Sequence, residues 1–161
     1  MSTSRISFDD AVLKKTAGAI ASYITQSLIE DGNLIRATRE GKPIGRASLA
    51  DYAYVAEGFW HYYLLTGSQD DMNTVQSIID AAWKKFYSAS GWLLGDMAGI
   101  DSAGRQGIIP DGPQASPSSV LLDISYQLAK KKGDKQFEEK PIAEINIGKR
   151  VLIKPGQRIA L

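Results

Sequence analysis

Two aspartates are the residues of this chain best suited to chemistry. Asp51 stands at the start of an apolar helical stretch, and Asp111 lies in a glycine-rich loop just ahead of another. Paired carboxylates across a pocket act as acid and base in sugar chemistry, so Asp51 and Asp111 are candidate catalytic residues. Each also has a structural interpretation, because Asp51 is the fourth residue of a capping box and Asp111-Gly112 is an ordinary turn pair.

Aromatic and cationic residues near these aspartates are candidate ligand contacts. Tyr52 lies at the same helix start as Asp51, and Trp92 lies in the loop that leads to Asp111, so each could stack on a sugar face. Arg46 could grip a carboxylate or a phosphate with its planar guanidinium. The alternatives are ordinary, since aromatic residues at helical spacing are more often core and a loop arginine is often a solvated charge.

Other chemistries have less support in the residue types present. The chain has no cysteine and one histidine, too few soft ligands for a transition-metal site, so we expect no metal and no cofactor. Glu57 and His61 share a helix face, where a carboxylate could orient the imidazole, although a lone histidine on an apolar helix is more often a core residue. No local motif supplies a base to a serine nucleophile. Whether the protein is an enzyme stays open.

Charge and hydropathy give no reason to expect nucleic acid or a membrane as a partner. The chain has 19 basic and 18 acidic residues, a net charge of +1. Its apolar stretches are far shorter than the ~18 residues of a membrane span, and its first thirty residues show amphipathic spacing rather than the apolar core of a signal peptide. We therefore expect a soluble, cytoplasmic protein.

Apolar spacing predicts four helices that alternate between one-sided and buried. Residues 8–29 and the segment from Met72 to Phe86 carry apolar residues on one face, whereas residues 48–65 and 116–132 form the two buried helices. Ser48 opens a capping box, and Ser116 is a cap residue followed by proline at the first helical position. This order is typical of antiparallel helical hairpins.

The connections between these helices are unequal. Two long, glycine-rich loops, residues 30–47 and 88–115, alternate with a short turn. If consecutive helices run antiparallel, both loops fall at one end, which is the predicted mouth of a binding site. Within the loops, Leu34-Ile35-Arg36-Ala37-Thr38 before Glu40-Gly41 predicts a short hairpin, and Gly91-Trp92-Leu93-Leu94-Gly95 predicts a brief extended segment.

Two strings of residues carry a family resemblance. Leu49-Ala50-Asp51-Tyr52-Ala53-Tyr54-Val55-Ala56-Glu57-Gly58, followed by Leu65-Thr66-Gly67, resembles the LxDYAYxxEG…TGD segment of the helical domain in the spermatogenesis-associated thioredoxin-domain proteins. The string from Asp111 to Val120 is similar to the family's DGAxPSGNSV segment, although Ala115, Pro117 and Ser118 stand where the family has Pro, Gly and Asn. The resemblance covers roughly residues 8–134.

The resemblance implies a six-hairpin glycosidase-type fold, an (α/α)6 toroid that sugar epimerases also share. It implies a carbohydrate-binding or carbohydrate-processing cleft, with Ser118, at the asparagine position, among its ligand contacts. The family's thioredoxin-like domain and several hairpins that would close the ring are missing, so we expect self-association or docking to a missing portion of the toroid. The alternative function is a non-catalytic helical scaffold or protein-interaction module, because a fold does not carry its chemistry with it.

The last stretch, residues 135–161, differs from the rest. Pro141, Gly148 and Pro155-Gly156 interrupt it, and its isoleucines and valine are compatible with strands. We expect either a β-hairpin or an irregular extension there. The predicted organisation is a partial toroid domain, residues 1–134, and a C-terminal extension, residues 135–161. The predicted fold class is mainly α, with short β segments in the loops.

Overall fold

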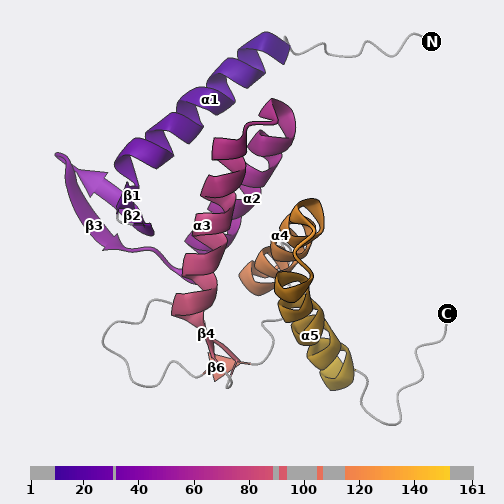
Figure 1. The fold of residues 1–161 in the computed structure, drawn as a ribbon. Helices are drawn as coiled ribbons and strands as arrows, with labels where there is room; N and C mark the ends of the chain where they lie inside the picture. The colour runs from indigo at the N-terminus through magenta and orange to yellow at the C-terminus, as the bar shows by residue number, and fades with distance from the viewer. Residues whose placement is uncertain (1–9, 31, 89–90, 94–104, 107–114, 153–161) are drawn as a thin grey trace, which may run out of the picture.

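The computed structural model describes residues 10–30, 32–88, 91–93, 105–106 and 115–152. This part of the chain is mainly helical, and its helices are α1 (Asp10–Ser27), α2 (Leu49–Thr66), α3 (Gln69–Phe86), α4 (Pro117–Lys132) and α5 (Lys135–Leu152). Figure 1 shows α2 and α3 side by side at the centre, with α1 to one side of them and α4 and α5 to the other. The four helices predicted from apolar spacing are confirmed.

Helix α2 begins and ends where its local sequence directs. The Ser48 side chain accepts from the backbone N–H of Asp51, and the Asp51 carboxylate accepts from the backbone N–H of Ser48, so the predicted capping box is present. Gly67 ends the helix in the left-handed conformation, with φ 68°, and its N–H donates to the carbonyl of Tyr63. The next helix starts at Gln69, which makes the α2–α3 connection as short as predicted.

The core lies where α3 and α4 meet α2. Helix α3 contributes one face of residues at helical spacing, and α4 contributes a matching set that includes Leu121, Ile124 and Leu128. Two polar contacts tie α4 to its neighbours: the Trp60 indole N–H donates to Gln127, and the Trp83 indole N–H donates to the Ser125 hydroxyl. Both buried indoles therefore keep a hydrogen-bond partner.

Short antiparallel strands occupy the described parts of the two long loops. In the first loop β1 (Ile29–Glu30), β2 (Asn33–Arg39) and β3 (Lys42–Arg46) pair in that order, and the β2–β3 turn holds Glu40 and Gly41 at φ 53° and 76°. The predicted hairpin is confirmed. In the second loop β4 (Tyr87–Ser88), β5 (Gly91–Leu93) and β6 (Arg105–Gln106) pair in order, which confirms the extended segment for residues 91–93.

The prediction for the C-terminal stretch is wrong over residues 135–152, which form helix α5 rather than a β-hairpin or an irregular extension. The Asp134 side chain accepts from the backbone N–H of Phe137 and starts the helix. Phe137, Pro141 and Glu144 then follow at spacings of four and three residues and turn towards the rest of the protein, while Ile142 stays exposed. Packing against α4 overrides both the internal proline and the β-branched residues.

Helix α1 makes few contacts with the rest of the described chain. It contacts α2 and β1, and most of its side chains are exposed. Within the described residues, no helix is long and apolar enough to cross a membrane.

Candidate functional site

The predicted catalytic pair is represented in the described structure by Asp51 alone, because Asp111 lies outside the described residues. The Asp51 carboxylate is half-buried and works as a cap: its Oδ2 accepts from the Ser48 backbone N–H at 2.7 Å and from the Ser48 hydroxyl at 2.8 Å. Those two bonds hold the side chain over the first turn of α2, at the edge of an apolar groove. In this structure the Asp51 carboxylate therefore acts as part of the helix cap.

Two of the predicted ligand contacts, Tyr52 and Trp92, lie in the core. Tyr52 is 0% exposed, and its hydroxyl accepts a hydrogen bond of 2.9 Å from the backbone N–H of Leu34 in β2. Trp92 is 1% exposed, with its rings 4.8 Å from those of Trp83 and 4.9 Å from that of Tyr87. Each aromatic ring joins a loop strand to the helical core, which leaves no surface for a ligand.

Arg46 and Ser118 are also separated from Asp51. Arg46 is exposed at the end of β3 and lines a cavity of about 450 Å³ with Lys85 and Phe86, a different hollow from the one beside Asp51. Ser118 is buried, and its hydroxyl lies 3.2 Å from that of the helix cap Ser116. The site residues that the structure describes do not converge on one cleft, and the Ser118 side chain is buried.

His61 is exposed on α2, so the expectation of a core histidine is wrong. Among the described residues, no group of three or more histidine, cysteine, aspartate or glutamate side chains is placed to hold a metal ion.

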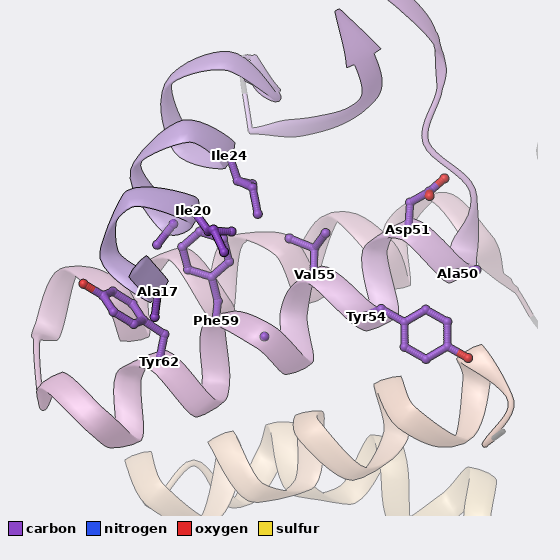
Figure 2. Close-up of a pocket in the computed structure, with 11 residues that line it drawn as sticks. Ala17, Ile20, Ile24, Ala50, Asp51, Tyr54, Val55, Phe59 and Tyr62 are labelled. Atoms are coloured by element: carbon purple, nitrogen blue, oxygen red, sulfur yellow. The ribbon is translucent and has the colours of Figure 1, made fainter. Parts of the chain in front are cut away.

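An open groove lies between α1 and α2 and is lined almost entirely by apolar residues. We call it the α1–α2 groove; its volume is about 410 Å³ and its lining residues are Ala17, Ile20, Ala21, Ile24, Ala50, Asp51, Tyr54, Val55, Gly58, Phe59 and Tyr62. Figure 2 shows Ile20 and Ile24 of α1 facing Phe59 and Val55 of α2, with the Asp51 carboxylate at one end. Asp51 is the one charged residue in this lining.

Two glycines shape the α1–α2 groove in different ways. A Cβ added at Gly18 of α1 would come within 3.0 Å of the Tyr62 hydroxyl, so glycine lets the two helices approach at that end. A Cβ added at Gly58 of α2 would meet no atom within 4 Å. Gly58 is therefore a gap in the helix surface, open to whatever lies in the groove.

Exposed apolar side chains also stand on the two helices that form the groove, and we call this set of residues the docking face. It consists of four residues of α1 that are 50–58% exposed, and two of α2 that are 40% and 51% exposed: Val12, Leu13, Ile20, Tyr23, Tyr54 and Leu65. On α2, helical spacing sets Tyr54, Gly58 and Leu65 along one side of the helix. The sequence predicted α2 to be covered on several sides, but this side is open.

A second cluster lies between α3 and α5. Tyr87 donates a hydrogen bond to the Glu144 carboxylate, which is only 7% exposed, in a cavity of about 410 Å³ also lined by Trp83, Lys84 and Lys140. Burial, the hydrogen bond to Glu144 and the charge of that carboxylate together raise the pKa of Tyr87 to about 12, with burial as the largest cause. The phenol therefore stays neutral and donates to the buried carboxylate at all physiological pH values.

No protein-family model and no curated protein matches the chain.

Proposed function

We propose that this protein is a helical docking module, which binds an apolar helix of another polypeptide in the α1–α2 groove and catalyses no reaction of its own. One observation carries the proposal: the two helices that form an open apolar groove also carry six large apolar side chains that are about half exposed, and two of these, Ile20 and Tyr54, line the groove. Surface isoleucine, leucine and tyrosine residues scattered singly need no explanation, whereas a contiguous patch marks an interaction site.

The size of the docking face fits this role. A buried aromatic side chain covers roughly 150–250 Å², so six large side chains at half exposure present on the order of 500 Å². That area is at the upper end of what a monomeric protein exposes in one patch, about 300–600 Å². Covering it is worth about 12 kcal/mol, enough to offset much of the roughly 4–15 kcal/mol that association costs.

The chemistry of the groove selects the kind of partner. The walls are aliphatic and aromatic, and Asp51, the single charged group in the lining, is already engaged by Ser48. An amphipathic helix that lays apolar side chains into a groove at spacings of three and four residues matches such walls. Gly58 gives that helix room to approach the backbone of α2.

The test is a titration with a helical probe. A fluorescein-labelled 18-residue peptide, with leucine at every third or fourth position and polar residues elsewhere, is added to the full chain and its anisotropy is followed. We expect saturable binding that Gly58→Leu weakens at least tenfold, because a leucine side chain at that position fills the groove.

Gly58→Ala is the matched control. Its single Cβ has open space around it, so it tests the helix substitution without closing the groove, and its binding should equal that of the original chain. If the peptide fails to bind, or if Gly58→Leu binds it as well as Gly58→Ala does, the docking function is wrong.

We also propose that the module is a segment of an antiparallel helical-hairpin arc, part of an (α/α)6 toroid of the six-hairpin glycosidase type. The support is the alternation of inner and outer helices: α2 and α4 contact each other, while α1, α3 and α5 flank them. The string around Asp51 and Tyr52 adds the family resemblance. A structure of the assembled protein that places hairpins of further chains beside α1 would test this arrangement, and a closed surface there would contradict it.

A carbohydrate cleft is the second candidate, and one observation favours it: Asp51 lines a cavity together with the rings of Tyr54 and Tyr62. Calorimetric titration with a panel of monosaccharides and uronic acids tests it. Binding that Asp51→Asn weakens would support the cleft, provided that Ser48→Ala, which disturbs the same cap, leaves binding intact. If no sugar binds, the carbohydrate cleft is contradicted and docking is the remaining candidate function.

A further inference from the structure

The helix that packs against the docking face is, we infer, helix α1 of a second copy of this chain, paired antiparallel about a two-fold axis close to Ala19 and Ile20. The inference rests on the proposed docking function and names its partner. Helix α1 itself carries most of the docking face and one wall of the groove.

Self-pairing requires a surface that complements itself. In a two-fold interface the same patch is used by both subunits, so a projecting side must lie next to a receiving side. On α1, helical spacing lines up Val12, Thr16, Ala19 and Tyr23 on the exposed flank, while Ala17, Ala21 and Ile24 face α2 across the groove, with Ile20 between the two sets. One helix thus offers side chains to a partner and a groove to receive the same side chains in return.

The charge pattern of α1 favours a copy of itself over a charged partner. From Thr16 to Ser27 the helix carries no charged residue, even though most of these side chains are exposed. An exposed helix is normally polar on its outer side. Two such segments meet without like-charge repulsion, and the small residue Ala19 on the exposed flank lets their backbones come close.

The two lysines of α1 set the orientation. Lys14 and Lys15 lie near the beginning of the helix. A parallel pair would bring the lysines of both copies together, whereas an antiparallel pair centred on Ile20 sets Lys15 of one copy beside position 25 of the other, so that the two Lys15 residues lie about 15 Å apart along the helix. At physiological ionic strength that separation exceeds the Debye length of about 8 Å. The helix dipoles also oppose each other in that orientation.

The area agrees with a stable dimer. Each copy would cover its docking face of roughly 500 Å², so the pair would bury about 1,000 Å² in total, the lower limit for a specific interface. The resulting layer would contain four helices, α1 and α2 of each copy, with the two α1 helices at its centre.

Solution mass is the first measurement. A single chain has a mass of 17.5 kDa, so light scattering of the full chain should give about 35 kDa and should fall to 17.5 kDa on dilution. Ile20→Glu, at a side chain that is more than half exposed and contributes little to folding, should raise the dimer dissociation constant at least tenfold while the far-UV circular dichroism stays unchanged.

Cysteine crosslinking then identifies the pairing, because the chain has no cysteine of its own. Ala19→Cys, near the axis, should form an intermolecular disulfide under mild oxidation, since this bond requires Cα atoms within about 7 Å. Thr16→Cys lies on the same flank but away from the axis, and it would crosslink to itself only in a parallel pair. Ser22→Cys, on the polar side, is the control for random collision.

The outcomes separate the two proposals. A 35 kDa species in which Ala19→Cys crosslinks and the other two variants do not is the expected result. A chain that stays at 17.5 kDa at every concentration, or a dimer in which Thr16→Cys crosslinks better than Ala19→Cys, overturns the antiparallel pairing. If the monomeric chain still binds the leucine peptide in a manner sensitive to Gly58→Leu, the docking function stands and the partner is a different polypeptide.

Discussion

Helix α2 has two apolar sides that differ in how far they are buried. On the side that meets α3 and α4, the residues Ala53, Ala56 and Trp60 are buried, and indole N–H groups and a serine hydroxyl complete the contacts. On the side that meets α1, an open groove remains and Tyr54 and Leu65 are about half exposed. The first side is fully packed, a finished core, whereas the second side is only partly covered by other residues of the chain.

The difference shows how apolar character divides between folding and association. A helix that is apolar all round needs neighbours on every side, and this chain supplies them on one side only. Substitutions on the α3–α4 side should therefore change the free energy of unfolding, whereas substitutions on the α1 side should change binding. The predictions that follow test this division.

The largest effect is expected from a cavity in the finished core. Leu121 of α4 is fully buried, so Leu121→Ala should lower the free energy of unfolding by about 2–5 kcal/mol. Leu13→Ala, at a side chain 50% exposed on α1, should cost less than about 1 kcal/mol when measured under conditions where the chain is monomeric. Urea denaturation compares the two, and equal losses would contradict the division.

Two tyrosine hydroxyls give the next comparison. Tyr87→Phe removes the donor to the buried Glu144 carboxylate and should cost about 1–3 kcal/mol. Tyr54→Phe, on the open side, removes a hydrogen bond of 3.0 Å to the exposed carbonyl of Ala115 and should cost at most about 1 kcal/mol. Denaturant midpoints of both variants measure the difference. A larger loss for Tyr54→Phe would contradict the idea that the buried Tyr87 hydrogen bond contributes more to stability.

The same pair has a pH signature. The pKa of Tyr87 is about 12 in the folded chain, against the ordinary tyrosine value of 10.0, so the fold favours the neutral form. Its contribution is complete below pH 10 and is lost as the pH rises from 10 to 12. Tyr87→Phe should flatten the decline of stability in this interval, whereas Tyr54→Phe should leave it as it is.

Loss of the helix cap at the start of α2 should lower stability by an intermediate amount. Ser48→Ala breaks the capping box that starts α2 and should cost about 1 kcal/mol. Because the helix belongs to both sides, the loss should appear in thermal unfolding and also, as fraying of the first turn, in weaker peptide binding near Asp51. If Ser48→Ala lowers stability but leaves peptide affinity unchanged, the first turn of α2 does not contribute to peptide binding.

The smallest expected effect is a gain. Gly58→Ala removes a glycine from the middle of a helix without touching another atom, and should raise stability by about 0.5–1 kcal/mol. Gly18→Ala places its Cβ within 3.0 Å of the Tyr62 hydroxyl and should gain less or lose stability. Thermal denaturation of the two variants distinguishes the free part of the groove from its contact point.

Local signals in the sequence predicted the helices and the first hairpin well. Capping residues, Ser116-Pro117 and the short turn at Gly67 act through nearest neighbours, so they can be interpreted without knowing the fold. The prediction for residues 135–152 was wrong because it weighed Pro141 and the β-branched residues of α5 alone. The contacts that decide that segment, between α5 and α4 and between Glu144 and Tyr87, join residues far apart in the chain.

The candidate site was harder to predict for the same reason. Tyr52 at a helix start and Trp92 in a loop have the residue types of ligand contacts, and only the position of the strands beside them shows that they are core. The groove had a signal that could have been found: a helix with no charge from Thr16 to Ser27 cannot be fully solvated on its outer side. How much of that side α2 covers depends on helix packing, which spacing alone does not specify.

The hydrogen bond from the Leu34 backbone to the Tyr52 hydroxyl joins the first hairpin to the most buried part of α2. Because the acceptor is a core side chain, the Leu34 amide can reach solvent only when the helix itself opens. Native-state hydrogen exchange should therefore place Leu34 in the same cooperative unfolding unit as α2, with slow exchange, while the neighbouring amides at the Glu40-Gly41 turn exchange on their own, faster timescale. The hairpin would then unfold in two stages, its tip before its base.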